Sequence, residues 1–284
     1  MNVPAREMHG LDDASGMPRV MGILNVTPDS FSDGGRYPTV DLAVRHALEM
    51  CEEGATVIDV GGESTRPGAP PIPEDDQISR VLPVIEALRA ARPSLLISVD
   101  TRSPRVAARA LAAGANIIND VSAGRQEGML ELVAATNATL VLMHMQGSPE
   151  TMQQAPAYDD VVEEVLEFLL ARVARARAAG IARANLVIDP GIGFGKTRQH
   201  NLALLAALPR FVATGYPVLL GTSRKRFMGA ICRETTADQL LGATCATTAL
   251  GVAAGVRLFR VHDVRANRQA IEVAWAITRA TSSP

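Results

Sequence analysis

The sequence predicts a single-domain (β/α)8 barrel, the TIM-barrel architecture of the α/β class. Short apolar runs rich in β-branched residues alternate with stretches of helical period, a pattern typical of parallel strands covered by helices. Eight such units fit a closed barrel better than an open doubly wound sheet, which usually has fewer strands. The expected strands are residues 20–26, 56–60, 95–99, 117–121, 140–145, 186–188, 218–220 and 258–261.

Helical segments separate these strands, and no low-complexity linker divides the chain. Its 284 residues suit one barrel, for which about 250 residues are typical. We expect an N-terminal extension at residues 1–17 and one catalytic barrel at residues 18–284. The arginines at residues 172–177 are expected on a solvated helix face. The expected helices include residues 39–53, 74–91, 104–113, 159–179 and 237–254.

Composition narrows the class of function. The net charge of −2 is nearly balanced and no basic stripe occurs, so we expect small-molecule substrates and no nucleic-acid partner. The three cysteines lack the spacing of a metal site or a disulfide framework, which indicates a reducing compartment. Residues 1–17 lack the apolar stretch of a signal peptide, and the most apolar late stretch, residues 243–256, is too short to cross a membrane. We therefore expect a cytoplasmic protein that does not bind membranes.

A polar or ionisable residue follows each apolar run. Because the C-terminal ends of barrel strands converge on one face, these residues predict an active site there. The carboxylates and the asparagine suit a heterocycle rich in N–H donors, and the cationic residues suit phosphate oxygens. Helix capping explains one or two of them, such as Asp120 and Ser122, but not all eight strand ends. In chain order the set is Asn25, Asp59, Asp100, Asn119 with Asp120, His144, Asp189, Ser223 with Arg224 and Lys225, and Arg260 with His262.

The run GIGFGKT at residues 191–197 invites a nucleotide-binding interpretation, which fails. A P-loop needs glycine at the position of Pro190, and the dinucleotide fingerprint needs glycine at that of Lys196. The run is better interpreted as a strand-to-helix loop that approaches its ligand closely. In such a loop Phe194 is able to stack on a flat ligand.

The chain has few histidines and very few lysines. His144 and His262 are not accompanied by the early His-x-His pair of hydrolytic metal barrels, so we expect no catalytic zinc. His144 stands in a Met-His-Met triplet, and Met143 is expected in the wall of the site. Of 28 lysine and arginine residues only Lys196 and Lys225 are lysines. Either an ammonium is needed at these two positions or they survived by chance, and the sequence leaves both alternatives open.

Eight runs of the sequence form one ordered set of motifs. They are MGILNVTPDSFSDGG (21–35), DVGGESTRPG (59–68), SVDT (98–101), INDV (118–121), MHMQG (143–147), DPGIGFGK (189–196), GTSRK (221–225) and RVHDV (260–264). Taken together, these motifs resemble the dihydropteroate synthase family, from about residue 21 to residue 264. The resemblance implies a (β/α)8-barrel enzyme that, with Mg2+, condenses 6-hydroxymethyl-7,8-dihydropterin pyrophosphate with p-aminobenzoate. The products would be 7,8-dihydropteroate, an intermediate of folate biosynthesis, and pyrophosphate.

The resemblance also implies roles for individual residues. Asp100, Asn119 and Asp189 would hold the pterin ring, and Lys225 would reach it from above. A second group would serve the pyrophosphate, and its asparagine would also bind the Mg2+. That group consists of Asn25, Arg260 and His262, and Ser223 is expected to bind substrate beside it. The residues expected to act in catalysis are Asp33, Asp189, Lys225, Arg260 and His262.

Two loops would close over p-aminobenzoate, and sulfonamides would compete for the same pocket. One of these loops carries Phe31 and Asp33, and the other carries Thr65, Arg66 and Pro67. Some family members have a serine after the conserved lysine, near the p-aminobenzoate carboxylate, where this chain has Arg226. Either Arg226 takes over that role or backbone N–H groups at the following helix start do so.

The helix expected at residues 237–254 is small and apolar nearly all round, which is typical of a helix buried on more than one side. The resemblance implies a homodimer built there. Two rival functions remain to be weighed. A pterin-binding methyltransferase domain would not need the pyrophosphate cluster, and an inactive paralogue would have lost a site residue, which this chain has not.

Overall fold

A computed structural model describes residues 16–26, 39–63, 71–234 and 236–280 of the chain. Eight parallel strands pair in the order β6-β5-β4-β3-β2-β1-β8-β7, so each strand lies beside its neighbour in sequence and β8 returns to β1. A bridge between Ile188 and Val218 joins the two remaining edges and closes the barrel, as predicted. The strands are β1 (Arg19–Asn25), β2 (Val57–Gly61), β3 (Leu96–Asp100), β4 (Ile117–Asp120), β5 (Thr139–Met143), β6 (Leu186–Asp189), β7 (Leu219–Leu220) and β8 (Leu258–Val261).

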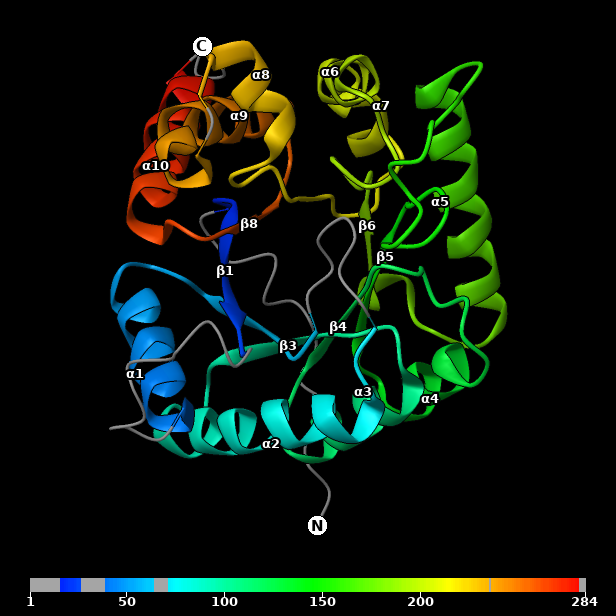
Figure 1. Ribbon diagram of the computed structural model, residues 1–284, viewed down its shortest axis with the longest axis vertical. Helices are drawn as coiled ribbons and strands as arrows, with labels where there is room; N and C mark the ends of the chain where they lie inside the picture. Colours follow the sequence, from blue (N-terminus) through cyan, green and yellow to red (C-terminus); the bar gives the residue numbers. More distant parts are fainter. Residues whose placement is uncertain (1–15, 27–38, 64–70, 235, 281–284) are drawn as a thin grey trace.

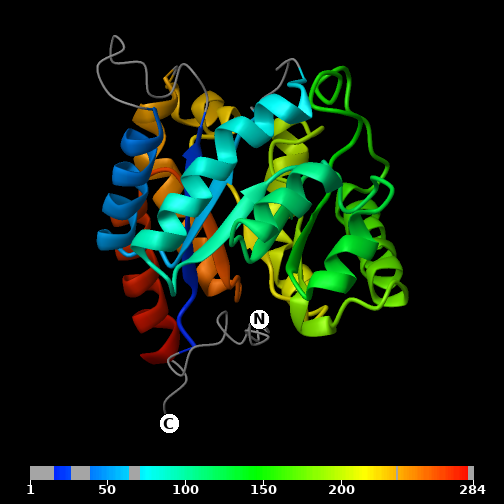
Figure 2. The same cartoon turned by 90° about the horizontal axis from the view of Figure 1, so that it is seen from below.

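Helices surround the strands as an outer ring (Figure 1), and a view from below shows the same arrangement (Figure 2). Several begin at side-chain caps: Ser103 accepts from the N–H of Val106, and Asp160 accepts from the N–H groups of Val162 and Glu163. The helices are α1 (Thr39–Glu52), α2 (Glu74–Ala91), α3 (Pro104–Ala112), α4 (Met129–Thr136), α5 (Val161–Ala178), α6 (Arg198–Ala206), α7 (Leu208–Val212), α8 (Arg226–Cys232), α9 (Leu241–Ala253) and α10 (Val264–Ala280), with short 3-10 turns η3 (Arg183–Asn185) and η4 (Ala237–Leu240).

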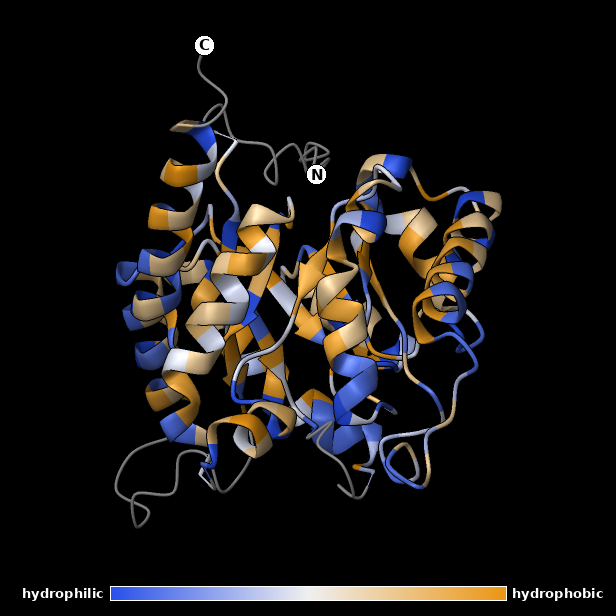
Figure 3. Ribbon diagram, turned by 90° about the horizontal axis from the view of Figure 1, so that it is seen from above, coloured by the Kyte–Doolittle hydropathy of each residue, from blue (hydrophilic) through white to orange (hydrophobic). Residues whose placement is uncertain are grey.

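Two apolar layers hold the barrel together. The larger lies between the outer faces of the strands and the inner faces of the helices, and colouring by hydropathy shows the strands and parts of the surrounding helices in orange (Figure 3). The smaller fills the inside of the barrel at the N-terminal half of the strands. It contains one side chain from every strand: Met21, Val57, Leu96, Ile117, Val141, Val187, Leu219 and Leu258. We call these eight residues the apolar ring.

The elements agree with the sequence prediction with one correction. The helix predicted at residues 237–254 is divided, because η4 ends at Leu240 before α9 begins. Leu240 has φ −89° and ψ 17°, outside the α-helical region, and its side chain is buried. A 3-10 turn at a helix start is a common solution when the first residues must turn inward to pack. Among the described residues, none of the helices combines the length and apolarity that a membrane span requires.

The apolar ring should dominate stability. Ile117 is 1% exposed within it, so replacing Ile117 by alanine leaves a cavity that the neighbouring strands cannot fill. We expect the free energy of unfolding of the Ile117→Ala variant to fall by about 2–5 kcal/mol in urea titrations. Ile231→Ala, on α8, is the matched control, because Ile231 is 51% exposed and its truncation should cost about 0.5 kcal/mol or less. Equal losses in the two variants would contradict this account of the core.

Candidate active site

The polar residues predicted at the strand ends lie above the apolar ring. Side chains two positions apart on a strand point to the same face, so a ring residue fixes the direction of the residue that follows it by two. Val57 lies in the ring, and Asp59 therefore points into the barrel one layer higher. The same relation places Asn119 above Ile117, Met143 above Val141, Asp189 above Val187 and Arg260 above Leu258. We call the polar residues of this set the polar layer, together with Asp100 at the end of β3, four positions after Leu96.

Arg260 connects the carboxylates of the polar layer. Its Nε donates to Oδ2 of Asp59 at 2.6 Å, and a terminal nitrogen donates to Oδ2 of Asp100 at 2.7 Å. Asn119 Nδ2 also donates to Asp59 Oδ2, at 3.0 Å. Burial raises the pKa of Asp100 to about 7, and the Arg260 guanidinium opposes that rise. Within the described part of the chain, the Oδ1 atoms of Asp59 and Asp100 are buried and have no hydrogen-bond partner, so each carboxylate keeps one unsatisfied acceptor.

Asp189 is a third buried carboxylate, at the end of β6. Its Oδ1 accepts from the backbone N–H of Gly191 at 2.7 Å, which fixes the side chain at the start of the loop that follows. Burial raises the pKa of Asp189 to about 6, against the effects of the Gly191 bond and of Lys225. A carboxylate that is buried but held charged by such partners is a strong acceptor for a ligand's N–H groups.

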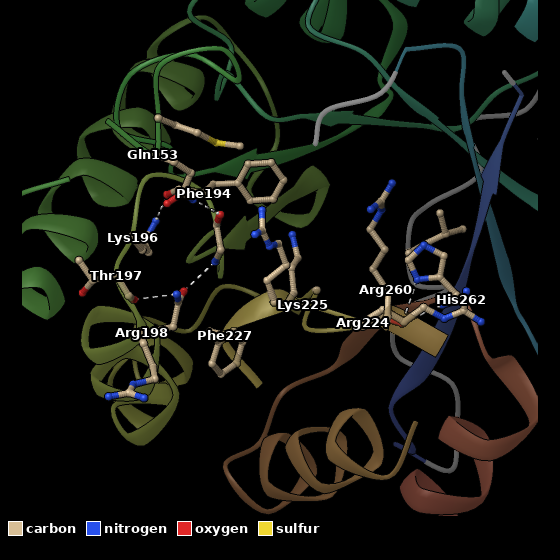
Figure 4. Close-up of a pocket in the computed structure, with 18 of the residues that line it drawn as sticks. Gln153, Phe194, Lys196, Thr197, Arg198, Arg224, Lys225, Phe227, Arg260 and His262 are labelled. Atoms are coloured by element: carbon tan, nitrogen blue, oxygen red, sulfur yellow. Dashed lines mark hydrogen bonds between the residues drawn. The ribbon is translucent and has the colours of Figure 1, made fainter. Parts of the chain in front are cut away.

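A cavity of about 830 Å3 opens beside this layer, and its wall is strongly cationic. Figure 4 shows Phe194 and Lys225 close together on one side of it, with Arg260 and His262 on the other side. No described carboxylate forms part of the wall. Six of the predicted site residues line it: Asn25, Phe194, Ser223, Lys225, Arg260 and His262. Such a wall suits an anionic group such as a phosphate.

The loop after β7 is tied to the end of β8. Ser223 Oγ lies 3.0 Å from Nδ1 of His262 and accepts from the His262 backbone N–H at 3.1 Å. The next residue, Arg224, has φ +58°, which is unusual for a residue with a side chain. Its guanidinium makes two bonds to Asp263, of 3.0 and 2.6 Å, and these keep the loop in place. The two strands thereby hold Ser223 and His262 side by side.

The loop after β6 places an aromatic ring against Lys225. The Lys225 ammonium lies 4.0 Å from the centroid of the Phe194 ring, within cation–π range. Phe194 also belongs to a small apolar cluster with Val121, Met143 and Met145, so Met143 packs near the loop after β6 but does not line the cavity itself. The ring and the ammonium thus form one edge of the site.

The structure assembles most of the predicted site. Asp100, Asn119, Asp189 and Met143 lie deeper in the barrel than the cavity wall, each less than 7% exposed. The loop residues lie outside the described part of the chain, so their predicted roles stay predictions; they are Phe31, Asp33, Thr65, Arg66 and Pro67.

Sequence reasoning missed the connecting residues. Asp59 is predicted from the sequence as one of the carboxylates that suit a heterocycle, but the sequence does not predict that it anchors both Arg260 and Asn119. The sequence also does not predict the ion pair between Arg224 and Asp263, which connects the loop after β7 to the end of β8. The sequence holds one indication of this: Asp59 follows Val57 by two positions, so its side chain points to the same face of the strand, towards the inside of the barrel.

The described residues offer little for a metal ion held by the protein alone. No group of three or more His, Cys, Asp or Glu side chains comes together among them. Asn25, at the end of β1, contributes an amide oxygen to the cavity wall. That is the donor type for a hard cation such as Mg2+, which usually takes one or two protein ligands and completes its shell with substrate phosphates and water.

Comparison with known proteins identifies the family. The family model described as "Pterin binding enzyme" matches residues 21–262, most of the chain. The chain belongs to the pterin-binding enzyme family. Dihydropteroate synthase from Escherichia coli (strain K12), a curated relative, is 47% identical over 259 residues, which cover 91% of this chain and 91% of that protein.

Solved structures of pterin-binding enzymes superpose closely on the barrel. Xanthomonas albilineans dihydropteroate synthase with 4-aminobenzoic acid is 48% identical and has a TM-score of 0.88, covering 96% of this chain and 98% of that chain. The enzyme from the same organism in complex with 7,8-dihydropteroate is 47% identical, with a TM-score of 0.85, 94% of this chain covered and 95% of that chain. At this identity the likeness extends beyond the fold.

Arg260 should be the most sensitive charge in this pterin-binding enzyme. Arg260→Met leaves Asp59 and Asp100 buried without a counter-charge, which should cost about 3–5 kcal/mol of unfolding free energy. The variant's Asp100 should have a pKa above the value of about 7 in the parent protein. A folded-state pKa above the unfolded value means that stability falls as pH rises through the interval between the two. The deficit should therefore be larger at pH 8 than at pH 5.

Urea titrations of both proteins at pH 5 and pH 8 measure this difference. Arg105→Met is the matched control, because Arg105 pairs with Asp75 on the surface, where both side chains are more than half exposed. That pair should contribute about 1 kcal/mol or less, with no growth of the deficit towards pH 8. A deficit of Arg260→Met that shrinks as pH rises would contradict the assignment of the buried carboxylates.

Proposed function

We infer that the chain condenses 6-hydroxymethyl-7,8-dihydropterin pyrophosphate with p-aminobenzoate, giving 7,8-dihydropteroate and pyrophosphate in folate biosynthesis. This is the reaction of the dihydropteroate synthases, which are transferases. The observation that carries the inference is the division of the site into buried carboxylates at the bottom and a cationic cavity above them. Such a site matches a substrate with an aminopyrimidine ring at one end and a pyrophosphate at the other.

The carboxylates of the polar layer suit the ring of the substrate. An aminopyrimidine presents adjacent N–H and NH2 donors, which one carboxylate can accept together. Asp189 and Asp100 are buried acceptors, and Asn119 adds an amide beside them. Phe194 supplies an aromatic face that can stack on a flat ring, next to the Lys225 ammonium. These four side chains and Lys225 are our proposed ring subsite.

The cationic wall suits the pyrophosphate. Lys225, Arg260 and His262 face the cavity, with Ser223 held against His262. We propose that Asn25 binds a Mg2+ ion that enters with the pyrophosphate, because the described residues provide an oxygen donor there but no protein cage. When bound, this ion would neutralise negative charge on the phosphate oxygens.

The chemistry needs a good leaving group rather than a strong base. The new bond forms between the amine nitrogen of p-aminobenzoate and the methylene carbon of the pterin, and the carbon–oxygen bond to pyrophosphate breaks. The aryl amine is neutral at pH 7 and can attack without prior loss of a proton. Preorganised cations at the departing oxygen stabilise the charge that develops there. The position of Lys225, Arg260 and His262 in the cavity wall supports this role.

The p-aminobenzoate subsite is a proposal that rests on fewer described residues. We expect Phe31, Asp33, Thr65, Arg66 and Pro67 to close over it. Arg226, the first residue of α8, is exposed and lines the cavity, so both it and the helix start remain candidates for the carboxylate. Sulfonamides, which mimic p-aminobenzoate, should compete there.

The assembly and location of the protein are proposals as well. We propose a homodimer built on α9 and α10, which pack against each other and expose large apolar side chains. These exposed residues are Leu241 and Leu250 on α9 and Val273 and Ile277 on α10. An apolar patch of this kind is typical of an association surface. We also propose that the protein works in the cytoplasm, on small-molecule substrates alone.

Pyrophosphate release tests the proposed reaction. Purified protein mixed with both substrates and Mg2+ should release pyrophosphate in equal amount to 7,8-dihydropteroate, and omission of p-aminobenzoate should abolish dihydropteroate formation. A protein that binds the pterin but releases no pyrophosphate would favour a binding protein without this activity. Methyl transfer from a methylated pterin to a cobalamin protein would instead favour the methyltransferase alternative.

Asp189→Asn should weaken pterin binding. The substitution keeps the size of the side chain but replaces a charged acceptor with an amide that can turn an NH2 group towards the ring's donors. We expect a loss of about 2–4 kcal/mol in calorimetric titrations with a pterin. Asp160→Asn, at the exposed start of α5, keeps its helix cap and should leave the affinity unchanged. Equal affinities of the two variants for the pterin would remove Asp189 from the ring subsite.

Leu250→Asp should convert the proposed homodimer to a monomer. Leu250 is 70% exposed on α9, so a charge there should leave the barrel intact while opposing burial in an interface. Light scattering at micromolar concentration should give a dimer mass for the parent protein and a monomer mass for the variant. Leu202→Asp on α6 is the control, because Leu202 is 41% exposed on a different helix. A monomeric parent protein would rule out the dimer.

A further inference from the structure

Lys196 is a buried lysine with no place in the proposed reaction. It is one of only two lysines among 28 basic residues, and it is 3% exposed. Its Nζ makes three contacts at hydrogen-bond distance: 2.9 Å to Nδ1 of His144, 3.3 Å to the His144 carbonyl and 2.9 Å to the Phe194 carbonyl. An ammonium has three donors, so a charged Lys196 satisfies all of them with neutral acceptors.

The cost of burying this amine is not repaid by an ion pair. Within the described residues, no carboxylate lies within salt-bridge distance of Lys196. Burial lowers the pKa of Lys196 to about 7, while Asp189 opposes the shift and Lys225 adds to it. Burial likewise lowers the pKa of His144 to about 2, with Lys196 and Arg125 acting in the same direction. A buried amine without a counter-charge lowers stability, so its benefit must lie in what it holds in place.

The contacts of Lys196 join the loop after β6 to the end of β5. His144 directly follows β5, and Phe194 lies in the loop. The two segments touch closely: a Cβ on Gly191, which has φ +67°, would lie 1.9 Å from the His144 carbonyl oxygen. Tyr158 adds a third attachment by donating to the Gly195 carbonyl at 2.7 Å. Figure 4 shows Lys196 beside the backbone of Phe194, on the side away from the Phe194 ring and Lys225.

The shape of the space explains why this residue is a lysine in a chain that otherwise uses arginine. The three acceptor atoms converge on one point, which suits the compact ammonium of lysine. The planar fork of arginine spreads its donors over a wider area and cannot direct them at one point. Lys196 reaches the cavity wall but is only 3% exposed, and His144 is 6% exposed, so little free space surrounds the amine. Of the two alternatives that the composition left open, the structure favours need over chance.

We propose that Lys196 is a positioning residue that fixes the Phe194 ring beside the Lys225 ammonium and thereby sets the geometry of the ring subsite. The Lys196 amine holds the backbone of Phe194 at its carbonyl, and the Phe194 side chain then meets Lys225. Lys196 itself does not touch the reacting atoms. The expected effect on pterin affinity rests on the proposed function. The expected position of the Phe194 ring beside Lys225 does not.

The scarcity of lysine makes a direct test possible. Protein labelled with 13C at lysine Cε should give two NMR signals, and Lys196→Met should remove one, leaving that of Lys225. Because the Lys225 ammonium lies over the Phe194 ring, its ε protons should be shifted upfield by the ring current. Phe194→Leu provides the position of the Lys225 signal without a ring. We expect the Lys225 signal in Lys196→Met to move at least half of the way to that position.

Pterin affinity supplies the second measurement. In Lys196→Met the affinity for 6-hydroxymethylpterin should fall about five- to tenfold, the effect of one misplaced aromatic contact. Thr248→Val is the matched control, because it breaks a buried bond of 2.7 Å to Asn267 between α9 and α10, away from the cavity. That variant should melt at a lower temperature but keep both the Lys225 signal and the affinity. If Lys196→Met does not fold, Lys196→Gln replaces it, because its amide keeps an N–H donor for the carbonyls. We expect a smaller shift of the Lys225 signal and a smaller loss of affinity in that variant.

The proposal requires that the folded variant show both a shifted Lys225 signal and a lower pterin affinity. If either stays unchanged, the proposal is wrong. It is also wrong if Thr248→Val changes the signal and the affinity as much as Lys196→Met does. Failure of the proposed function is a separate outcome, seen as a parent protein that releases no pyrophosphate. In that case the NMR measurement still decides whether Lys196 positions Phe194.

Discussion

Arg260 brings a guanidinium between Asp59 and Asp100 inside the barrel, and it does so two positions above an apolar side chain of its own strand. Removing the guanidinium or the carboxylates would leave the remaining charge buried and unpaired. That loss of stability is larger than the net stabilisation that the ion pair provides. The apolar ring below excludes water from this layer, so the pairing must be made by protein groups or by a ligand. Each of the two carboxylates still keeps one acceptor, its Oδ1 atom, without a partner among the described residues.

The alternation of side chains along each strand explains how much of this could be predicted from the sequence. Residues such as Asp189 and Asn119 end apolar runs, so their convergence follows once a parallel barrel is assumed. The pairing of Arg260 with Asp59 could not be predicted, because it joins strands about 200 residues apart and depends on the closure of β8 onto β1 and β2. The prediction that the arginines at 172–177 are solvated is wrong for Arg172, which is buried and donates to the carbonyls of Ala123 and Gly124 at 2.7 Å.

The glycine-rich loop after β6 shows why a run of glycines taken alone does not reveal its function. Its sequence resembles a nucleotide-binding run, yet its glycines serve a different need. Gly191 and Gly195 have positive φ, and a side chain on either would collide with the backbone at the end of β5. The close approach of the two segments is what brings the Lys196 amine within reach of the His144 carbonyl. Neither the collision nor the attachment can be inferred from residue types alone.

Arg260 links the two ends of the site, because it pairs with the buried carboxylates and also lines the cationic cavity. A negatively charged group entering the cavity would share the guanidinium with Asp100, and the weaker pairing would tend to raise the pKa of that carboxyl further. A ring that donates N–H groups to the same carboxylate has the opposite effect and favours its charged form. A substrate that carries both groups therefore balances these two demands, whereas either fragment alone would satisfy only one of them.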